Sequence, residues 1–551
     1  MRQVSEISAC IAGALGERPA DVVIRGGRIF DLVTGELRVA DVAIVGERIV
    51  GVGGSYQGFC EVDARGLTVV PGFADAHCHI ESSLVVPYHW EEAVLAHGTV
   101  AAVCDPHELA NVCGVAAIDY FRQCAAGMVM RLQVQVPSCV PALPTEEAGA
   151  RLGAEALAPY GAAGLGLAEM MNVPGVLGRD GDVLAKLAAF SAGCVDGHAP
   201  MLGGQALDAY VAAGIANDHE CSTVPEALEK VRRGMTVFVR AGSVGRNLAD
   251  LAPLLSLTLS GRVCLCTDDR DPLDIGQEGH LDAAIRQAIG LGCDPLAVYR
   301  AASLSVAQHY GWRWRGLVAP GYLADVALLS DLAACRVERV VCRGRLVDEE
   351  AFARRPEVAL PAAFLQTMHG RPLTATDFMG ARGEPVVGVR EGTLLTEALT
   401  YAEAEARGDV ALAALVERHG HSGRIGLGWV SGFGLKRGAV ASTVGHDSHN
   451  LCVVGATAAE MALAANALRA VGGGFAVAIG EEVRAVLPLA VGGLMSQAPA
   501  AEVAIQLEAL RAAARETGSG LSNPFLSLAF LPLPVIPAAR LTLGGAVKVA
   551  F

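Results

Sequence analysis

Eight short apolar runs alternate with helix-like stretches between residues 67 and 311, and this alternation constrains the fold more than any other feature of the chain. The runs cover residues 67–73, 99–105, 131–138, 163–169, 192–198, 214–219, 235–240 and 262–268. Segments between them, such as VPEALEKVRRG at 224–234, have helical periodicity, and a last helical stretch covers 294–311. Eight strands that alternate with helices are typical of a (β/α)8 TIM-type barrel, so we predict the α/β fold class.

The regions that flank the predicted barrel have different patterns. Residues 21–54 and 316–348 both alternate in strand fashion. A polar stretch with Pro and Arg at 354–385 then leads to a separate C-terminal domain. A chain of 551 residues is too long for one compact core. The predicted units are a small split β domain (1–66 plus 312–353), the catalytic barrel (67–311) and an additional C-terminal α+β domain (370–551).

Composition and charge exclude several classes of protein. Hydrophobic residues make up 52% of the chain and charged residues 18%, which excludes a disordered chain. Acidic residues outnumber basic ones by 58 to 43, and no basic run is interleaved with aromatic residues, so we expect no nucleic-acid partner. The start of the chain lacks the apolar core of a secretory signal, and no apolar run reaches the roughly 18 residues of a membrane span, so we expect no membrane association.

Cysteine usage indicates a reducing compartment. The 15 cysteines are scattered without a Cys-x-x-Cys pair, which disfavours a disulfide framework or a thiolate zinc site. We therefore predict that the protein is cytoplasmic. Its Ala- and Leu-rich faces suit a subunit interface as well as a core, and we expect a homo-oligomer, either a dimer or a tetramer.

Residues that bind metals stand where the predicted barrel strands end. His77 and His79 follow the first run, and residues two apart on a strand point to the same face. The later strand ends add further imidazoles and carboxylates, and the candidate metal ligands are His77, His79, Glu169, His198, His219 and Asp268. Reactive groups of barrel enzymes gather at this end of the strands, and the set suits one or two divalent ions such as Mn, Fe or Zn. An isolated His-x-His pair would more often be a surface or hydrogen-bonded pair.

Two of these carboxylates, Asp268 and Glu169, are also candidate catalytic residues. Asp268 can accept a proton from a water whose pKa a metal lowers to about 7, and can later return that proton to a leaving amine. A helix-capping role is the alternative for Asp268, because Asp269 stands beside it. Glu169 is the candidate for a ligand shared by two ions, because no lysine stands at a barrel strand end. The lysines are Lys186, Lys230, Lys436 and Lys548.

Motifs along nearly the whole chain resemble those of the amidohydrolase superfamily and, within it, those of the bacterial adenine deaminase family. The motifs are PGFADAHCHIESS (71–83), CDPHELANVCG (104–114), GLAEMMNVPGV (166–176), GHAP (197–200), NDHEC (217–221), TDDR (267–270), APGYLADV (319–326), GFGLKRGAVASTVGHDSHN (432–450) and LPLPVIP (531–537). The C-terminal motifs separate this family from other amidohydrolases. Small departures occur at Leu84, Cys104 and Gly445, where the family has Met, Thr and Ala, and none of them removes a candidate ligand.

The resemblance implies an activity, a cofactor and a substrate. It implies hydrolysis of adenine to hypoxanthine and ammonia, in purine metabolism, at a binuclear divalent metal site for which Mn2+ or Fe2+ is favoured and Zn2+ is possible. The six candidate ligands would hold the ions, Asp268 would shuttle the proton, and the partner would be a small purine base. Two alternatives are an amidohydrolase that acts on another amino-heterocycle or a cyclic amide, and a non-enzymatic binding protein on a barrel scaffold.

A second group of titratable residues lies beside the predicted site. Candidates for substrate binding or proton relay are Glu81, Asp105, His107, Glu108 and Asp269. They could bind purine nitrogens, relay protons, hold an extra metal, or simply orient the metal ligands. In the C-terminal domain, the cluster from His446 to His449 forms either a surface turn or a cap over the active site, and Lys436 and Arg437 either neutralise carboxylates or have a structural role.

Overall fold

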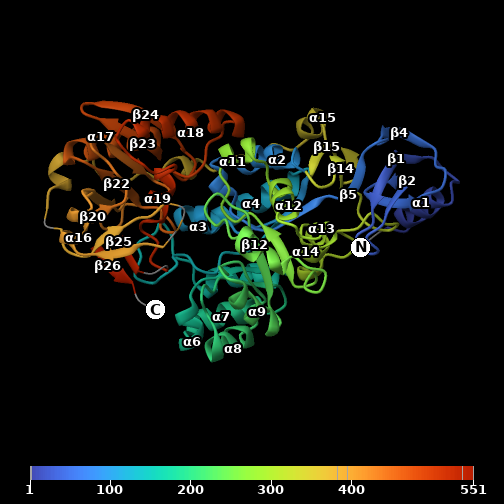
Figure 1. Ribbon diagram of the computed structural model, residues 1–551, viewed down its shortest axis with the longest axis horizontal. Helices are drawn as coiled ribbons and strands as arrows, with labels where there is room; N and C mark the ends of the chain where they lie inside the picture. The colour runs from blue at the N-terminus through green and yellow to red at the C-terminus, as the bar shows by residue number, and fades with distance from the viewer. Residues whose placement is uncertain (1–2, 381, 392, 394, 536–537, 550–551) are drawn as a thin grey trace.

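The computed structural model describes residues 3–380, 382–391, 393, 395–535 and 538–549. They form three adjoining parts, with a β-rich unit near the N-terminus at one end, the barrel strands and their helices in the centre, and a C-terminal α+β unit at the other end (Figure 1). The last two residues of the motif LPLPVIP, Ile536 and Pro537, lie outside the described residues.

One eight-stranded sheet joins two segments that are far apart in the chain. Its spatial order is β16 (Arg345–Leu346), β15 (Arg336–Cys342), β14 (Val326–Asp331), β5 (Thr68–Pro71), β1 (Ala20–Phe30), β2 (Leu37–Val45) and β3 (Arg48–Val52), with β4 (Gly58–Asp63) also paired to β1. Strand β5 runs parallel to β1 and antiparallel to β14, so it connects the two segments. Helix α1 (Val4–Ala14) contacts β2 and β3. This sheet supports the proposed split β domain.

The prediction of a single strand over residues 67–73 is wrong. Strand β5 ends at Pro71 in the β-rich sheet, and a separate strand, β6 (Phe73–Cys78), begins the barrel. Gly72 joins them at a crowded place, because a Cβ there would lie 2.4 Å from a methyl group of Val100. His77 therefore lies on β6, with His79 just beyond it, and both belong to the barrel.

The central part contains eight parallel strands, as the sequence alternation predicts. They are β6, β7 (Thr99–Cys104), β8 (Arg131–Val134), β9 (Leu167–Met170), β10 (Val195–Gly197), β11 (Asn217–Asp218), β12 (Thr236–Arg240) and β13 (Val263–Cys266). They pair as three ladders, β6-β7-β8, β9-β10 and β11-β12-β13. Backbone hydrogen bonds near the strand ends connect β8 to β9 and β10 to β11, and the Asp268 N–H donates to the His77 carbonyl at 3.0 Å between β13 and β6. The TIM-type α/β prediction is confirmed, with a ladder interrupted at these three junctions.

Helices follow the barrel strands and cover them. They are α2 (Pro87–Leu95), α3 (His107–Cys113), α4 (Val115–Gly127), α5 (Ala154–Ala162), α6 (Val173–Gly178), α7 (Gly181–Ala189), α8 (Gly204–Ala212), α9 (Val224–Arg232), α10 (Leu248–Leu251), α11 (Pro272–Gln277), α12 (Leu281–Gly290), α13 (Pro295–Ala301) and α14 (Leu304–His309). Every residue of β6, β7, β12 and β13 is buried. Parallel strands covered on both faces need such continuous apolar runs, which explains the sequence pattern.

The C-terminal unit is built on a second eight-stranded sheet. Its spatial order is β18 (Glu397–Leu399), β17 (Val386–Gly388), β20 (Ile425–Ser431), β19 (Ala411–Val416), β22 (Leu451–Gly455), β21 (Ala439–Ser442), β23 (Gly474–Ile479) and β24 (Glu482–Pro488). Helix α17 (Ala458–Val471) packs on this sheet through a small apolar cluster that includes Met461 and Leu468. The hairpin of β25 (Ala538–Thr542) and β26 (Gly545–Val549) contacts β20.

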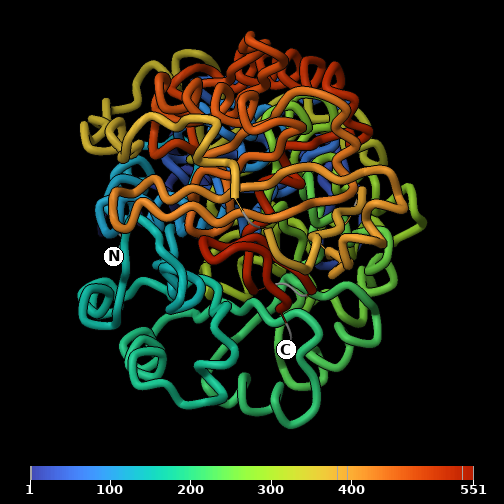
Figure 2. The backbone as a smooth tube through the Cα atoms, turned by 90° about the vertical axis from the view of Figure 1, so that its left-hand side faces the viewer, coloured from blue at the N-terminus to red at the C-terminus, as the bar shows by residue number. Residues whose placement is uncertain are grey.

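The C-terminal unit packs directly on the barrel. A single cluster of buried apolar side chains contains residues of both, among them Ile80 of the barrel and Leu528 of α19 (Pro524–Phe530). The Ser496 N–H donates to the Leu84 carbonyl at 2.7 Å, and Arg511 of α18 (Ala500–Arg515) pairs with Asp271 at 2.5 Å. Figure 2 shows the C-terminal sheet in orange and red in front of the barrel. Among the described residues, no helix is long and apolar enough to cross a membrane.

Candidate metal centre and active site

The structure brings the six candidate metal ligands together at one end of the barrel. His77 lies on β6 and Glu169 on β9, while the other four side chains stand one or two positions after their strands. All six are buried, and the least buried, His198, is 9% exposed. The carboxyl ends of parallel barrel strands meet at one rim, so side chains far apart in the sequence converge there.

The Glu169 carboxylate lies between two groups of imidazoles. Its Oε1 faces His77 Nε2 at 3.8 Å and His79 Nε2 at 3.3 Å. Its Oε2 faces His198 Nδ1 at 2.7 Å and His219 Nε2 at 3.2 Å. The two oxygens of one carboxylate therefore serve two separate pairs of histidines, which is the arrangement that a ligand shared by two ions requires.

Asp268 completes the first of these two groups. Its Oδ1 lies 3.5 Å from His77 Nε2 and 3.3 Å from His79 Nε2. The two imidazole Nε2 atoms are themselves 3.1 Å apart. Asp268 has φ 58°, a left-handed conformation that non-glycine residues rarely adopt and that is frequent at functional sites.

The electrostatics of the centre favour positive charge. Burial opposes ionisation of Glu169, but the charge of His219 and the hydrogen bonds from the imidazoles hold the pKa of this carboxyl well below its usual range. Burial also opposes protonation of His79, but the bonds to Asp268 and Glu169 outweigh it and raise the pKa of this imidazole well above its ordinary value. A site that attracts a proton so strongly also suits a cation. More than one set of its side chains lies within the ligand spacing of one ion, among them Glu169, His198 and His219, and His77, His219 and Asp268. The donor set therefore fits divalent metal ions.

A charged pair that the sequence reasoning missed holds Asp268 in place. Arg240, the last residue of β12, donates from Nη1 to Asp268 Oδ2 at 2.9 Å. Glu220, next to His219, accepts from both terminal nitrogens of the same guanidinium. Because Arg240 occupies Oδ2, the Oδ1 atom is left to face the imidazoles. The one sequence signal that could have identified Arg240 is its position at the end of a barrel strand.

The five candidates for substrate binding or proton relay lie around the same centre, in different environments. Asp105 accepts from His107 Nδ1 at 3.0 Å, and the His107 ring lies edge-on to His79 with centroids 4.5 Å apart. Glu81 accepts from the Leu109 N–H at 3.0 Å and so supports the start of α3. Burial raises the pKa of Glu81 to about 7.

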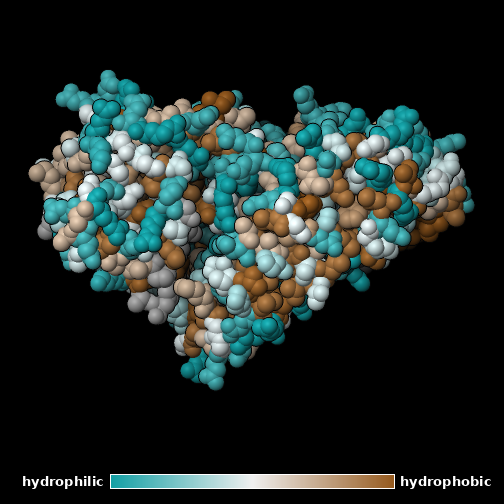
Figure 3. Space-filling view, in the orientation of Figure 1, coloured by the Kyte–Doolittle hydropathy of each residue, from teal (hydrophilic) through white to brown (hydrophobic). Residues whose placement is uncertain are grey.

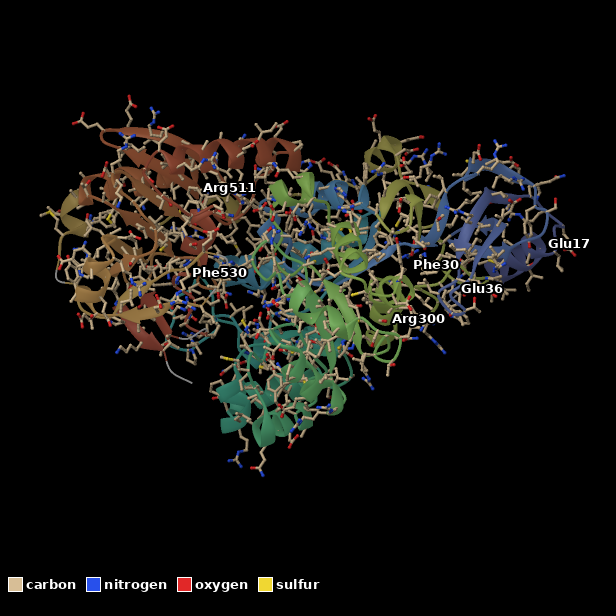
Figure 4. All side chains as sticks on the ribbon, viewed as in Figure 1. Glu17, Phe30, Glu36, Arg300, Arg511 and Phe530 are labelled. Carbon is tan, nitrogen blue, oxygen red and sulfur yellow. The ribbon has the colours of Figure 1, made fainter. Side chains whose placement is uncertain are left out.

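Asp269 lines a cavity between the barrel and the C-terminal unit. Ser82 donates its hydroxyl to the Asp269 carboxylate, and the cavity wall also contains His446 and Phe530 from the C-terminal unit. The rings of His446 and Phe530 stack with centroids 4.3 Å apart and planes 19° from parallel. Figure 4 labels Phe530 on the side of the C-terminal unit that faces the barrel, and the space-filling view in Figure 3 shows the surface hollowed where the two parts meet.

The cluster from His446 to His449 is buried, so the prediction of a surface turn is wrong. His446 contacts Glu108 at 2.5 Å through Nδ1, and His449 contacts the other oxygen of Glu108 through Nε2. A chain turn that is polar in sequence thus becomes internal, because it packs on α3 of the barrel. The alternative, a cap over the active site, agrees with this position. Lys436 and Arg437 instead lie away from it, and both donate backbone N–H groups to the Thr517 carbonyl.

Comparisons with known proteins agree with the two-part motif pattern. A model of the amidohydrolase family matches residues 68–347, and a model of the adenine deaminase C-terminal domain matches residues 391–551. A protein named adenine deaminase from Methylobacterium nodulans is 51% identical over 559 residues, which cover 99% of this chain and 98% of that protein. Proteins of the same name from Cereibacter sphaeroides (strain ATCC 17025) and Gluconobacter oxydans are 52% and 50% identical, each with 98% of both chains covered.

Proposed function

The chain belongs to the adenine deaminase family of amidohydrolases, and from this premise we propose that it hydrolyses adenine to hypoxanthine and ammonia, a reaction of purine metabolism. The observation that carries the proposal is the Glu169 carboxylate between two pairs of histidines, with Asp268 beside the first pair. Deamination of an aromatic amine needs a strong nucleophile and a proton for the leaving group, and this arrangement is suited to both.

The proposed metal ligands are the six residues at the barrel rim. His77, His79 and Asp268 would hold one divalent ion, His198 and His219 a second, and Glu169 would be shared. The resemblance to the family favours Mn2+ or Fe2+, with Zn2+ possible, and mixed imidazole and carboxylate sets suit all three. When bound, such ions lower the pKa of a water molecule to about 7 and so supply hydroxide at neutral pH.

Asp268 is the proposed general base and acid. Arg240 anchors its Oδ2 at 2.9 Å, and its Oδ1 points to the imidazoles at the centre. From there it would take a proton from the attacking water as the C–O bond forms and return it to the amino group, which then leaves as ammonia when the C–N bond breaks, while Glu169 holds the histidines in position. The enzyme thereby avoids expelling an amide anion, which is a poor leaving group.

The cavity beside Asp269 is the proposed binding site of the purine. Asp269, the neighbour of Asp268 in the chain, lines this cavity and so places it beside the metal centre. The cavity wall combines aromatic and apolar side chains with a few polar ones, which suits a planar base. Asp269 would hydrogen-bond to the base. Glu81, Asp105, His107 and Glu108 lie in the layer next to the metal ligands, where they would relay protons or keep the ligands oriented.

The Asp268→Asn variant tests the proposed chemistry. We expect its release of ammonia from adenine to fall by about 10²- to 10⁴-fold, the usual contribution of a general acid–base group, with the fold unchanged by circular dichroism. Asp208→Asn, the same substitution at an exposed position on α8, is the matched control and keeps its activity. Unchanged turnover in Asp268→Asn refutes the role of Asp268. A panel of amino-heterocycles and cyclic amides assayed with the wild type decides the substrate, and faster turnover of another compound refutes adenine.

Assembly and location are further parts of the proposal. We place the enzyme in the cytoplasm, because its 15 cysteines are free thiols. We expect a dimer or tetramer, because large apolar side chains such as Val39 and Phe59, 72% and 75% exposed, gather on the N-terminal unit. Brown patches at that end of the molecule are visible in Figure 3. Light scattering of the wild type and of Phe59→Ser measures the oligomer, and a monomeric wild type refutes it.

A further inference from the structure

A second cluster of buried histidines and carboxylates lies where the C-terminal unit meets the barrel. The barrel contributes His107 and Glu108 from the start of α3. The C-terminal unit contributes His446, Asp447 and His449 from the segment between β21 and β22. None of the five is more than 6% exposed.

The contacts converge on the Glu108 carboxylate. Its Oε1 lies 2.5 Å from His446 Nδ1 and 3.2 Å from His107 Nε2, and its Oε2 faces His449 Nε2. The Asp447 Oδ1 lies 3.9 Å from both His107 Nε2 and His446 Nδ1. Three imidazole nitrogens and two carboxylates therefore point into one small volume.

Several of these polar atoms have no hydrogen-bond partner. Asp447 Oδ2 is buried without any hydrogen-bond partner among the described residues. Glu108 Oε2 and His449 Nε2 are also buried, and the close contact between them does not have the geometry of a hydrogen bond. A buried polar atom without a partner destabilises the folded chain, and more so if it is charged. The carboxylates also raise the pKa values of the His107 and His446 imidazoles, so protons on these rings balance the negative charge of the cluster. A divalent cation at the centre would take the place of these protons and give Asp447 Oδ2, Glu108 Oε2 and His449 Nε2 a common partner.

The cluster is separate from the proposed catalytic centre. The two nitrogens of the His107 ring face different neighbours: Nδ1 faces Asp105 and, at 3.4 Å, Glu169, whereas Nε2 faces Glu108 and Asp447. A ligand bound through Nε2 thus leaves the Nδ1 side unchanged. His107 forms the wall between the two groups.

We propose that His107, Glu108, His446, Asp447 and His449 form an additional divalent cation site that joins the C-terminal unit to the barrel. Mixed nitrogen and oxygen ligands suit Mn2+, Fe2+ or Zn2+. The ion is a structural cross-link, because its ligands come from both the barrel and the C-terminal unit. It would stabilise the wall of the cavity that contains His446 and Phe530.

The test is the metal stoichiometry of the full chain. Metal-free protein is titrated with Mn2+ and, separately, with Zn2+, and bound metal is measured by mass spectrometry after removal of free ions. We expect the wild type to bind about one equivalent more than the proposed catalytic pair, and His449→Gln and Glu108→Gln each to lose about that one equivalent. His421→Gln is the matched control, because this histidine also lies between the two units, bonded to the Ala148 carbonyl at 3.1 Å, but outside the cluster.

Two outcomes overturn the proposal. Either the wild type binds no equivalent beyond the catalytic pair, or the extra equivalent persists in both Glu108→Gln and His449→Gln. If a variant does not fold, anomalous diffraction from Mn2+-loaded wild-type crystals decides, and no peak between Glu108 and His449 refutes the site. If the wild type binds the additional equivalent of metal but does not release ammonia from adenine, the result counts against the proposed reaction and supports this cation site.

Discussion

Replacement of Arg240 by Met separates the anchoring of Asp268 from its chemistry. In the structure Arg240 is 6% exposed and contacts Asp268, Glu220 and Asn247. Met removes the positive charge, so buried Asp268 and partly buried Glu220 both lose their arginine partner and keep only the neighbouring imidazoles. Breaking a buried ion pair from one side costs about 3–5 kcal/mol, so we expect the free energy of unfolding to fall by that amount.

The expected effect on catalysis is smaller than that of removing Asp268 itself. Partners that orient metal ligands contribute about 10- to 100-fold, so kcat for ammonia release from adenine should fall within that range. Arg240→Lys keeps a charge without the forked geometry and should recover part of the loss. The double variant Arg240→Met/Glu220→Gln should regain stability, because the side chain at 220 no longer carries a charge that lacks its arginine partner. It should not regain kcat.

The assay is steady-state ammonia release, with metal content and urea unfolding measured on the same samples. Arg484→Met is the control, because this arginine forms ion pairs on the exposed face of β24. This substitution should change neither kcat nor the free energy of unfolding. Wild-type kcat in fully metal-loaded Arg240→Met would show that Asp268 needs no anchor, and this part of the reasoning would be wrong.

Three further predictions concern stability. Lys230 and Asp218 form a fully buried ion pair at 2.9 Å, so Lys230→Met should lower the free energy of unfolding by about 3–5 kcal/mol, and an unchanged urea midpoint would contradict this. Burial, with the nearby Arg262 charge, lowers the pKa of His309 from 6.5 to about 4. The contribution of this neutral imidazole to the free energy of unfolding is therefore fully present above pH 6.5 and is lost as the pH falls toward 4. His309→Gln should make the free energy of unfolding depend less on pH in this range, as measured by unfolding curves. Chelation should lower the melting temperature, because Glu169 and Asp268 lose their compensating charge, and Mn2+ should restore it; a melting temperature independent of metal would count against the centre.

The strand ends of the barrel were predictable because they depend on local patterns. A buried parallel strand needs a continuous apolar run, and the chain after it needs polar groups at the rim, so His198 and His219 stand out without tertiary information. The division between β5 and β6 was missed, because two adjacent buried strands that belong to different sheets read as one apolar run. Arg240 was missed because an arginine at a strand end has no metal-binding signature of its own.

The sequence alone determined the order of strands and helices and the kinds of side chain at the barrel rim, since periodicity and turn chemistry are local properties of a chain. Only the tertiary structure decided which oxygen of Glu169 faces which histidine, and that the buried segment around Ser448 meets barrel residues about 300 positions away, as in its bond to Glu146. Such contacts depend on how surfaces from distant parts of the chain pack together, and no local pattern encodes the distance between them.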